Sequence, residues 1–176
     1  MQMHVKTKKI AVSGICLAVA MILILAGSLI DVSSLSFMLL ASFVLGVVVN
    51  ACGLKMSAVY FVASVALGFF ILPVKLHVLT YGLMEAYILI RELLWEKVIS
   101  KKNIKKITYL LIKLGIFNLL FIPPVVLISD FLFTPADTGF MRVCLILLAE
   151  VAFVIADMAY DVFVRYILSR LKFLKN

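Results

Sequence analysis

The chain has 176 residues, of which 65% are hydrophobic and 15% charged, and its mean hydropathy is +1.22. A soluble domain carries about 25% charged and about 45–50% apolar residues, and a soluble fold of this size could not cover so much apolar surface. The composition therefore predicts an integral membrane protein. The net charge of +8 does not indicate nucleic-acid binding, because the basic residues cluster at the ends of apolar segments and no polar face interleaves them with aromatic residues.

Six apolar segments follow one another along the chain, and they predict an all-α fold: a polytopic bundle of six transmembrane helices that forms a single membrane domain over residues 1–176. The first is expected to be an uncleaved membrane segment, because it is long for a signal peptide. Pro73 ends the third segment, and Pro123-Pro124 predict a kink or an unwound turn in the fifth. The expected segments are about 10–30, 35–51, 56–72, 76–90, 107–128 and 140–164.

The second, third and fourth segments are short for membrane spans, since about 20 residues cross a bilayer perpendicularly. They count 17, 17 and 15 residues. Either their helices extend into the flanking residues or the bundle is locally thin.

A basic stretch from Arg91 to Lys106, RELLWEKVISKKNIKK, separates the fourth and fifth segments and carries six Lys and Arg residues. Each such residue costs roughly 2.5–3.5 kcal/mol at mid-bilayer on insertion scales, so the stretch is expected to be a cytoplasmic loop. With six crossings, both termini are then cytoplasmic as well, and 14 of the 17 basic residues lie inside. This distribution follows the positive-inside rule.

Motifs of catalysis and of cofactor binding are missing from the sequence: it has no HExxH, no GxSxG, no P-loop and no glycine-rich nucleotide fingerprint. The three cysteines, Cys16, Cys52 and Cys144, form no CxxC, lie in or beside apolar runs and are expected to be small buried hydrophobic residues. We therefore expect a protein that is not an enzyme, with no catalytic residue, no metal site and no cofactor.

Ionisable side chains within the apolar segments are the strongest indication of function, because burying a charge in a membrane is expensive. In the sixth segment they share one helix face, which must contact protein or a water-filled cavity: Arg142, Glu150, Asp157, Asp161 and Arg165. Asp161 and Arg165 are expected to pair at i,i+4 near the cytoplasmic end. Arg142 and Glu150, in the outer half, are candidates for binding a ligand.

The fourth segment has a second polar face, formed by His77, Tyr81 and Glu85 at i, i+4 and i+8. Glu85 lies about as deep as Lys113 of the fifth segment, so we predict an interhelical Glu85–Lys113 ion pair with a structural role. His77 either faces the surface or, with Tyr81, belongs to a ligand site near the outer face.

Asn118, midway along the fifth segment, needs a polar partner in lipid. An interhelical hydrogen bond would provide one, and a bound ligand is the alternative that adds Asn118 to the candidate substrate-binding residues.

Small residues line one face of the first segment: Ala11, Gly14 and Ala18, at i, i+3 and i+7. Such residues let another helix approach closely. The approaching helix belongs either to the same chain or to a partner protein.

The start KKIAVSGICLAVAMIL, followed by six segments with both ends inside, resembles the substrate-binding S components of energy-coupling factor (ECF) importers. The resemblance implies a bacterial plasma-membrane protein that captures a small polar nutrient near the outer face. It also implies a partner: a transmembrane coupling subunit, driven by ABC-type ATPases, that docks on Ala11, Gly14 and Ala18. The family often has two alanines four residues apart, and here glycine takes one place.

The stretch GFFILPVKLHVLTYGLMEAYIL is similar to MreD-type cell-shape proteins, which are small six-helix membrane scaffolds. This second resemblance implies a different class, a scaffold that transports nothing. A scaffold would use its polar faces for packing, whereas an S component would gather them around an outer cavity.

Overall fold

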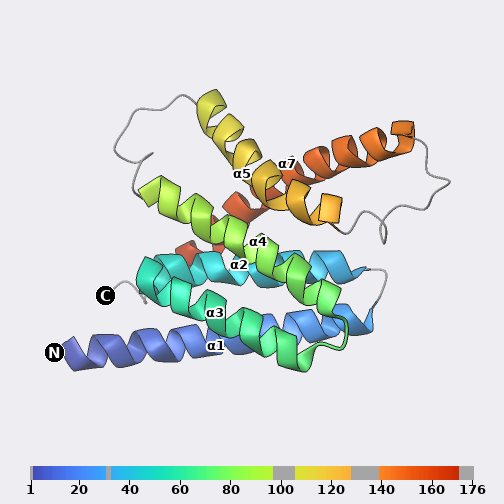
Figure 1. The fold of residues 1–176 in the computed structure, drawn as a ribbon. Coiled ribbons are helices and arrows are strands. Elements are labelled where there is room, and N and C mark those ends of the chain that lie inside the picture. The colour runs from blue at the N-terminus through green and yellow to red at the C-terminus, as the bar shows by residue number, and fades with distance from the viewer. Residues whose placement is uncertain (1, 31–32, 97–105, 128–138, 171–176) are drawn as a thin grey trace.

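The computed structural model describes residues 2–30, 33–96, 106–127 and 139–170, except the side chains of 2–6, 106, 125–127, 139–143 and 145. In these ranges the chain is all-α and forms six helices (Figure 1). They are α1 Gln2–Leu29, α2 Ser34–Cys52, α3 Leu54–Ile71, α4 Lys75–Leu94, α5 Lys106–Leu127 and α7 Gly139–Arg170. The predicted helical class is confirmed, and each predicted segment corresponds to one helix.

The three short segments extend into their flanking residues. α2, α3 and α4 have 19, 18 and 20 residues, which at 1.5 Å per residue approaches the thickness of a hydrocarbon core. Pro73 follows the end of α3 as expected, but Pro123 and Pro124 lie inside α5, which stays helical to Leu127. The unwound turn predicted there is therefore absent from the described part of α5.

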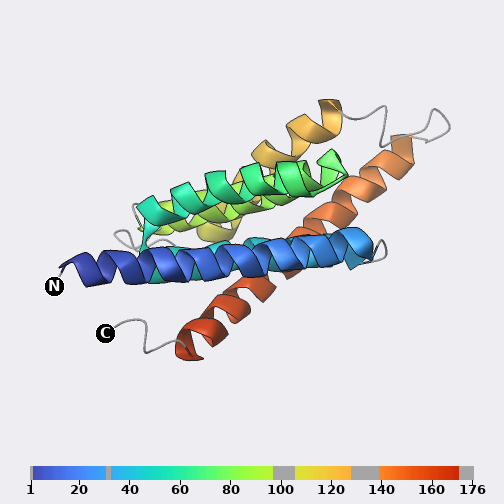
Figure 2. The same ribbon diagram turned by 90° about the horizontal axis from the view of Figure 1, so that it is seen from below.

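Helix α2 is the centre of the bundle, because it contacts α1, α3, α4 and α7. Its residues from Ala41 to Val48 are all buried. Helices α1 to α4 run nearly side by side, while α7 crosses the bundle obliquely and α5 contacts both α4 and α7 (Figures 1 and 2). The beginning of α1, the α2–α3 turn, the end of α4 and the end of α7 lie at the same end of the bundle (Figures 1 and 2).

Glycine is needed at two places in this packing. Gly53 alone connects α2 to α3, with φ +90° and ψ 164°, a conformation that is essentially restricted to glycine. Gly46 lets α7 approach α2, since a Cβ there would lie 2.2 Å from the Tyr160 hydroxyl oxygen. Tyr160 in turn packs edge-on against Phe43, with ring centroids 5.3 Å apart.

Two lysines stabilise helix ends by donating to carbonyl groups that no helical N–H can reach. Lys9 Nζ donates to Cys52 O at 3.2 Å, at the end of α2. Lys75 Nζ donates to Phe69 O at 2.5 Å and to Leu72 O at 3.0 Å, at the end of α3. Both place a positive charge at the negative end of a helix dipole.

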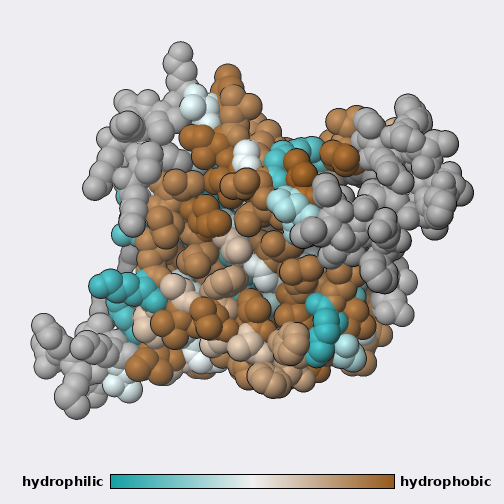
Figure 3. Space-filling view, in the orientation of Figure 1, coloured by the Kyte–Doolittle hydropathy of each residue, from teal (hydrophilic) through white to brown (hydrophobic). Residues whose placement is uncertain are grey.

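The outer surface of the bundle is largely apolar. Large hydrophobic side chains such as Ile15, Phe70 and Leu119 are exposed, and hydrophobic residues predominate on the face in Figure 3. Within the described residues, four helices are long and apolar enough to cross a membrane: Thr7–Leu29, Ser34–Cys52, Leu54–Ile71 and Ile107–Pro124. These apolar helices are compatible with a membrane-embedded protein.

Candidate functional site

Four charged side chains meet where α4, α5 and α7 come together, and we call them the charge cluster: Arg91, Lys113, Asp157 and Asp161. Lys113 Nζ lies 2.6 Å from Asp157 Oδ2 and 3.6 Å from Asp161 Oδ2. Arg91 Nη1 lies 2.9 Å from Asp157 Oδ1, and Nη2 pairs with Asp161 Oδ1. The Tyr87 hydroxyl donates to Asp157 Oδ1 at 2.9 Å. Two cations thus face two carboxylates.

Burial makes the balance of charge in this cluster important. Arg91 and Lys113 are each 4% exposed and Asp157 is 6% exposed, whereas the side chain of Asp161 is 44% exposed. A buried charge that lacks a partner is strongly destabilising, so each cation requires a nearby carboxylate. Arg91 also stacks on Tyr160, with Cζ 4.4 Å from the ring centroid. The charge cluster connects helices α4, α5 and α7 through its ion pairs.

The structure corrects three predictions about these residues. Arg91 was assigned to a cytoplasmic loop, but it belongs to α4 and its side chain is buried. Lys113 pairs with Asp157 of α7 rather than with Glu85, because α5 turns this lysine toward α7. Arg165 is exposed and donates to the backbone carbonyl of Asp161 at 2.9 Å, since the Asp161 carboxylate is already engaged by Arg91.

Glu85 occupies a separate polar site between α3 and α4. Its side chain is fully buried, as are those of Ser64 and Tyr81. Ser64 Oγ lies 2.5 Å from Oε2, and the Tyr81 hydroxyl lies 2.5 Å from Oε1. Tyr60, 2% exposed, completes this group and donates to Cys16 O at 3.4 Å. We call Glu85, Ser64, Tyr81 and Tyr60 the glutamate site.

The candidate ligand residues whose side chains the structure describes do not gather in one place. Asn118 and Glu150 meet, with Asn118 Nδ2 donating to Glu150 Oε1 at 2.6 Å. Tyr81 belongs to the glutamate site. His77 is partly buried, and its Nδ1 has no hydrogen-bond partner among the described residues. The side chain of Arg142 lies outside the described residues.

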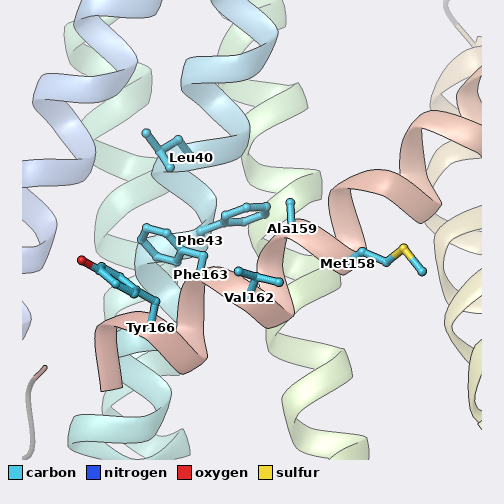
Figure 4. Close-up of a pocket in the computed structure, with 7 residues that line it drawn as sticks. All are labelled: Leu40, Phe43, Met158, Ala159, Val162, Phe163 and Tyr166. Atoms are coloured by element: carbon cyan, nitrogen blue, oxygen red, sulfur yellow. The ribbon is translucent and has the colours of Figure 1, made fainter. Parts of the chain in front are cut away.

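Two open grooves lie against α7. One has a volume of about 310 Å³ and is lined by Glu150 together with Leu114, Val151, Val154 and Ile155. The other has a volume of about 540 Å³ and lies between α2 and α7 (Figure 4). Its lining is aliphatic and aromatic, including Leu40, Phe43, Val162 and Phe163. Such a surface suits a lipid chain better than a polar nutrient. Neither groove is lined by residues of α4.

The small-residue face of α1 points away from the rest of the chain. Ala11, Gly14 and Ala18 are all exposed, and a Cβ added at Gly14 would meet no atom within 4 Å. The opposite side of α1 packs into the core through Ala20 and Ile24. The sequence left two alternatives for the helix that packs on this face. In the described structure, no helix of the same chain packs on it.

Several polar residues of the two buried sites were not among the candidates from the sequence. Ser64 and Tyr60 lie on the one buried face of α3, which is formed by Ser57, Tyr60, Ser64 and Gly68. The three polar residues stand at i, i+3 and i+7 of an apolar segment, and this pattern would have indicated the face. Cys144 is exposed, so the expectation of a buried cysteine is wrong there.

Comparisons with protein-family models, with curated proteins and with solved structures find no match. The class of the protein therefore follows from its own fold and composition. It is an all-α protein in which four described helices are long and apolar enough to span a membrane, with buried polar groups between its helices.

Proposed function

We propose that this protein is a membrane subunit that acts through a partner docked on α1, in the manner of an S component of an ECF importer. The observation that supports this function is the uncovered face of Ala11, Gly14 and Ala18. Small residues permit close helix packing, and here no helix of the described chain makes use of them. In this proposal six helices cross the bacterial plasma membrane and both termini are cytoplasmic.

The ligand in this proposal is a small polar nutrient bound beside Asn118 and Glu150. Their hydrogen bond places an amide and a carboxylate next to the groove that Glu150 lines. A carboxylate in an apolar groove favours a ligand that carries a positive charge or hydrogen-bond donors. Arg142 remains a candidate for this site, whereas His77 belongs to α4, which does not line the groove, and Tyr81 is engaged by Glu85.

A second function, a membrane scaffold of the MreD type, is favoured by a different observation. The polar side chains largely satisfy one another: Asn118 pairs with Glu150, and Lys113 and Arg91 pair with Asp157. In a scaffold these pairs would serve packing alone, and no ATPase would associate with the protein.

Affinity purification distinguishes the two functions. A tagged chain, extracted from its own membrane in mild detergent, is expected to retain a transmembrane coupling subunit and ABC-type ATPases, identified by mass spectrometry. The variant Gly14→Leu should lose them, because its side chain occupies the space that the partner helix needs.

Gly115→Leu is the matched control, since Gly115 lies exposed on α5 and a Cβ there also meets no atom within 4 Å. This variant should retain the partners. ATPases that remain bound to Gly14→Leu would refute docking on α1, and their absence from the natural chain would favour the scaffold.

A further inference from the structure

The glutamate site differs from the charge cluster in having no cation among the side chains that the structure describes. No Lys, Arg or His side chain that the structure describes forms an ion pair with Glu85. Its neighbours are the hydroxyl groups of Ser64 and Tyr81, with Tyr60 beyond them. Asp157 is buried to a similar degree but lies next to both Lys113 and Arg91. Two buried acids of one chain thus occupy opposite electrostatic environments.

The number of hydrogens at this site indicates the protonation state of Glu85. Ser64 Oγ lies 2.5 Å from Glu85 Oε2 and 2.9 Å from the backbone carbonyl oxygen of Phe61. A carbonyl oxygen can only accept, and a serine hydroxyl has a single hydrogen to donate. Tyr81 has one hydrogen as well, and its hydroxyl lies against Glu85 Oε1.

Three hydrogen bonds between these oxygens therefore need three hydrogens. An ionised Glu85 leaves only the two hydrogens of Ser64 and Tyr81. A protonated Glu85 adds the third: its hydroxyl donates to Ser64 Oγ, Ser64 donates to Phe61 O, and Tyr81 donates to Oε1. Each oxygen then has the hydrogen bond that its distance implies.

From these contacts we infer that Glu85 is a proton-binding site in the interior of the helix bundle, holding its proton as a neutral carboxylic acid. Its full burial supports this state, because an ionised carboxylate away from water and from any cation is far less stable than the neutral acid. The inference is independent of docking on α1 and of the nutrient site.

The surroundings of the glutamate site determine how the proton can leave. The titratable groups that face it are Tyr81 on α4, Tyr60 on α3 and, beyond Tyr60, Cys16 on α1. The central helix α2 contributes no charged residue along its length. Glu85 can therefore ionise only when α3 and α4 separate enough to admit water or a cation, so loss of the proton is coupled to opening of the helix packing.

Infrared spectroscopy of the purified full chain tests this inference. At neutral pH the natural protein should show the carbonyl stretching band of a protonated carboxylic acid, shifted by ¹³C-labelled glutamate and not by ¹³C-labelled aspartate. Glu85→Gln should remove the band. Ser64→Ala should move it, because the acid loses its hydrogen-bond acceptor and the variant keeps the helix intact.

Glu150→Gln is the matched control, because it makes the same substitution at a glutamate of α7 outside the glutamate site, and it should leave the band in place. Absence of the band from the folded natural protein would overturn the inference. So would a band that survives Glu85→Gln or, if that variant does not fold, one that Ser64→Ala leaves unmoved.

Discussion

Asp157 Oδ2 lies 2.6 Å from Lys113 Nζ, and both side chains are buried although 44 residues separate them in the chain. Arg91 approaches the other oxygen of the same carboxylate at 2.9 Å. One aspartate of α7 therefore pairs with a cation from α4 and with a cation from α5. This shared carboxylate connects α5 to α7, together with the hydrogen bond from Asn118 to Glu150.

Replacing this aspartate should unbalance the charge cluster. Asp157→Asn leaves Arg91 and Lys113 with only Asp161, and removing one partner of a buried ion pair destabilises by about 3–5 kcal/mol. We expect a large decrease in the amount of folded protein in the membrane. Thermal unfolding in detergent, followed by size-exclusion chromatography, measures the loss.

A second substitution tests whether charge, rather than shape, causes this loss. Adding Lys113→Met to Asp157→Asn leaves one cation, Arg91, facing one carboxylate, Asp161. The double variant should unfold at a higher temperature than Asp157→Asn alone. If it is equally unstable or worse, electrostatic balance does not explain the role of Asp157.

The contact between Gly46 and Tyr160 leads to a second prediction. In Gly46→Ala the added Cβ would lie 2.2 Å from the tyrosine hydroxyl oxygen and 2.7 Å from two ring carbons. The ring cannot move freely, because Tyr160 also donates to Glu92 Oε1 at 2.8 Å and packs on Phe43. We expect a loss of about 1–3 kcal/mol in stability, as is usual for overpacked cores.

Gly115→Ala provides the comparison for this substitution, because a Cβ at Gly115 meets no atom within 4 Å. Its stability should stay within about 1 kcal/mol of the natural chain, the scale of the glycine–alanine difference in helix propensity. Equal melting temperatures for the two alanine variants would contradict the close packing of α7 on α2.

The turn at Gly53 leads to a third prediction, which concerns the backbone alone. A Cβ at this position meets no atom within 4 Å, but φ is +90°. Gly53→Ala should therefore destabilise by roughly 1–3 kcal/mol through backbone strain. Gly68→Ala on α3, where the new Cβ would make an ordinary 3.7 Å contact with Val78, should have little effect. The melting temperatures of the two variants, measured by circular dichroism in the same detergent, would show the difference. A Gly53→Ala variant that melts at the same temperature as the natural chain would contradict this backbone conformation.

The helices themselves could be predicted from the chain, because apolar runs long enough for a membrane alternate with breaks of known chemistry. Gly53 and Pro73 mark two of these breaks, and the structure ends helices beside both. The exact ends were less predictable, since a helix continues into polar residues wherever tertiary contacts satisfy them. Arg91 shows this: its charge predicted a loop, and two aspartates of α7 hold it in a helix.

The partners of the buried charges could not be predicted from the sequence. Lys113 lies at a depth that suits either Glu85 or Asp157, and depth along a helix does not define which face meets which neighbour. Tyr87 and Asp157 contact each other across 70 residues, a relation that no local pattern encodes. The crossing of α7 over α2 and α4 decides these partners.

The sequence by itself determined the helical architecture of this protein and the suitability of its helices for a lipid environment. Both depend on local properties, because hydrophobicity and helix length can be summed along the chain. Only the tertiary structure decided that Asp157 receives two cations while Glu85 receives two hydroxyl groups. The reason is physical: in an apolar bundle the state of each polar group depends on the few atoms that rotation and tilt of the helices bring within 3 Å of it.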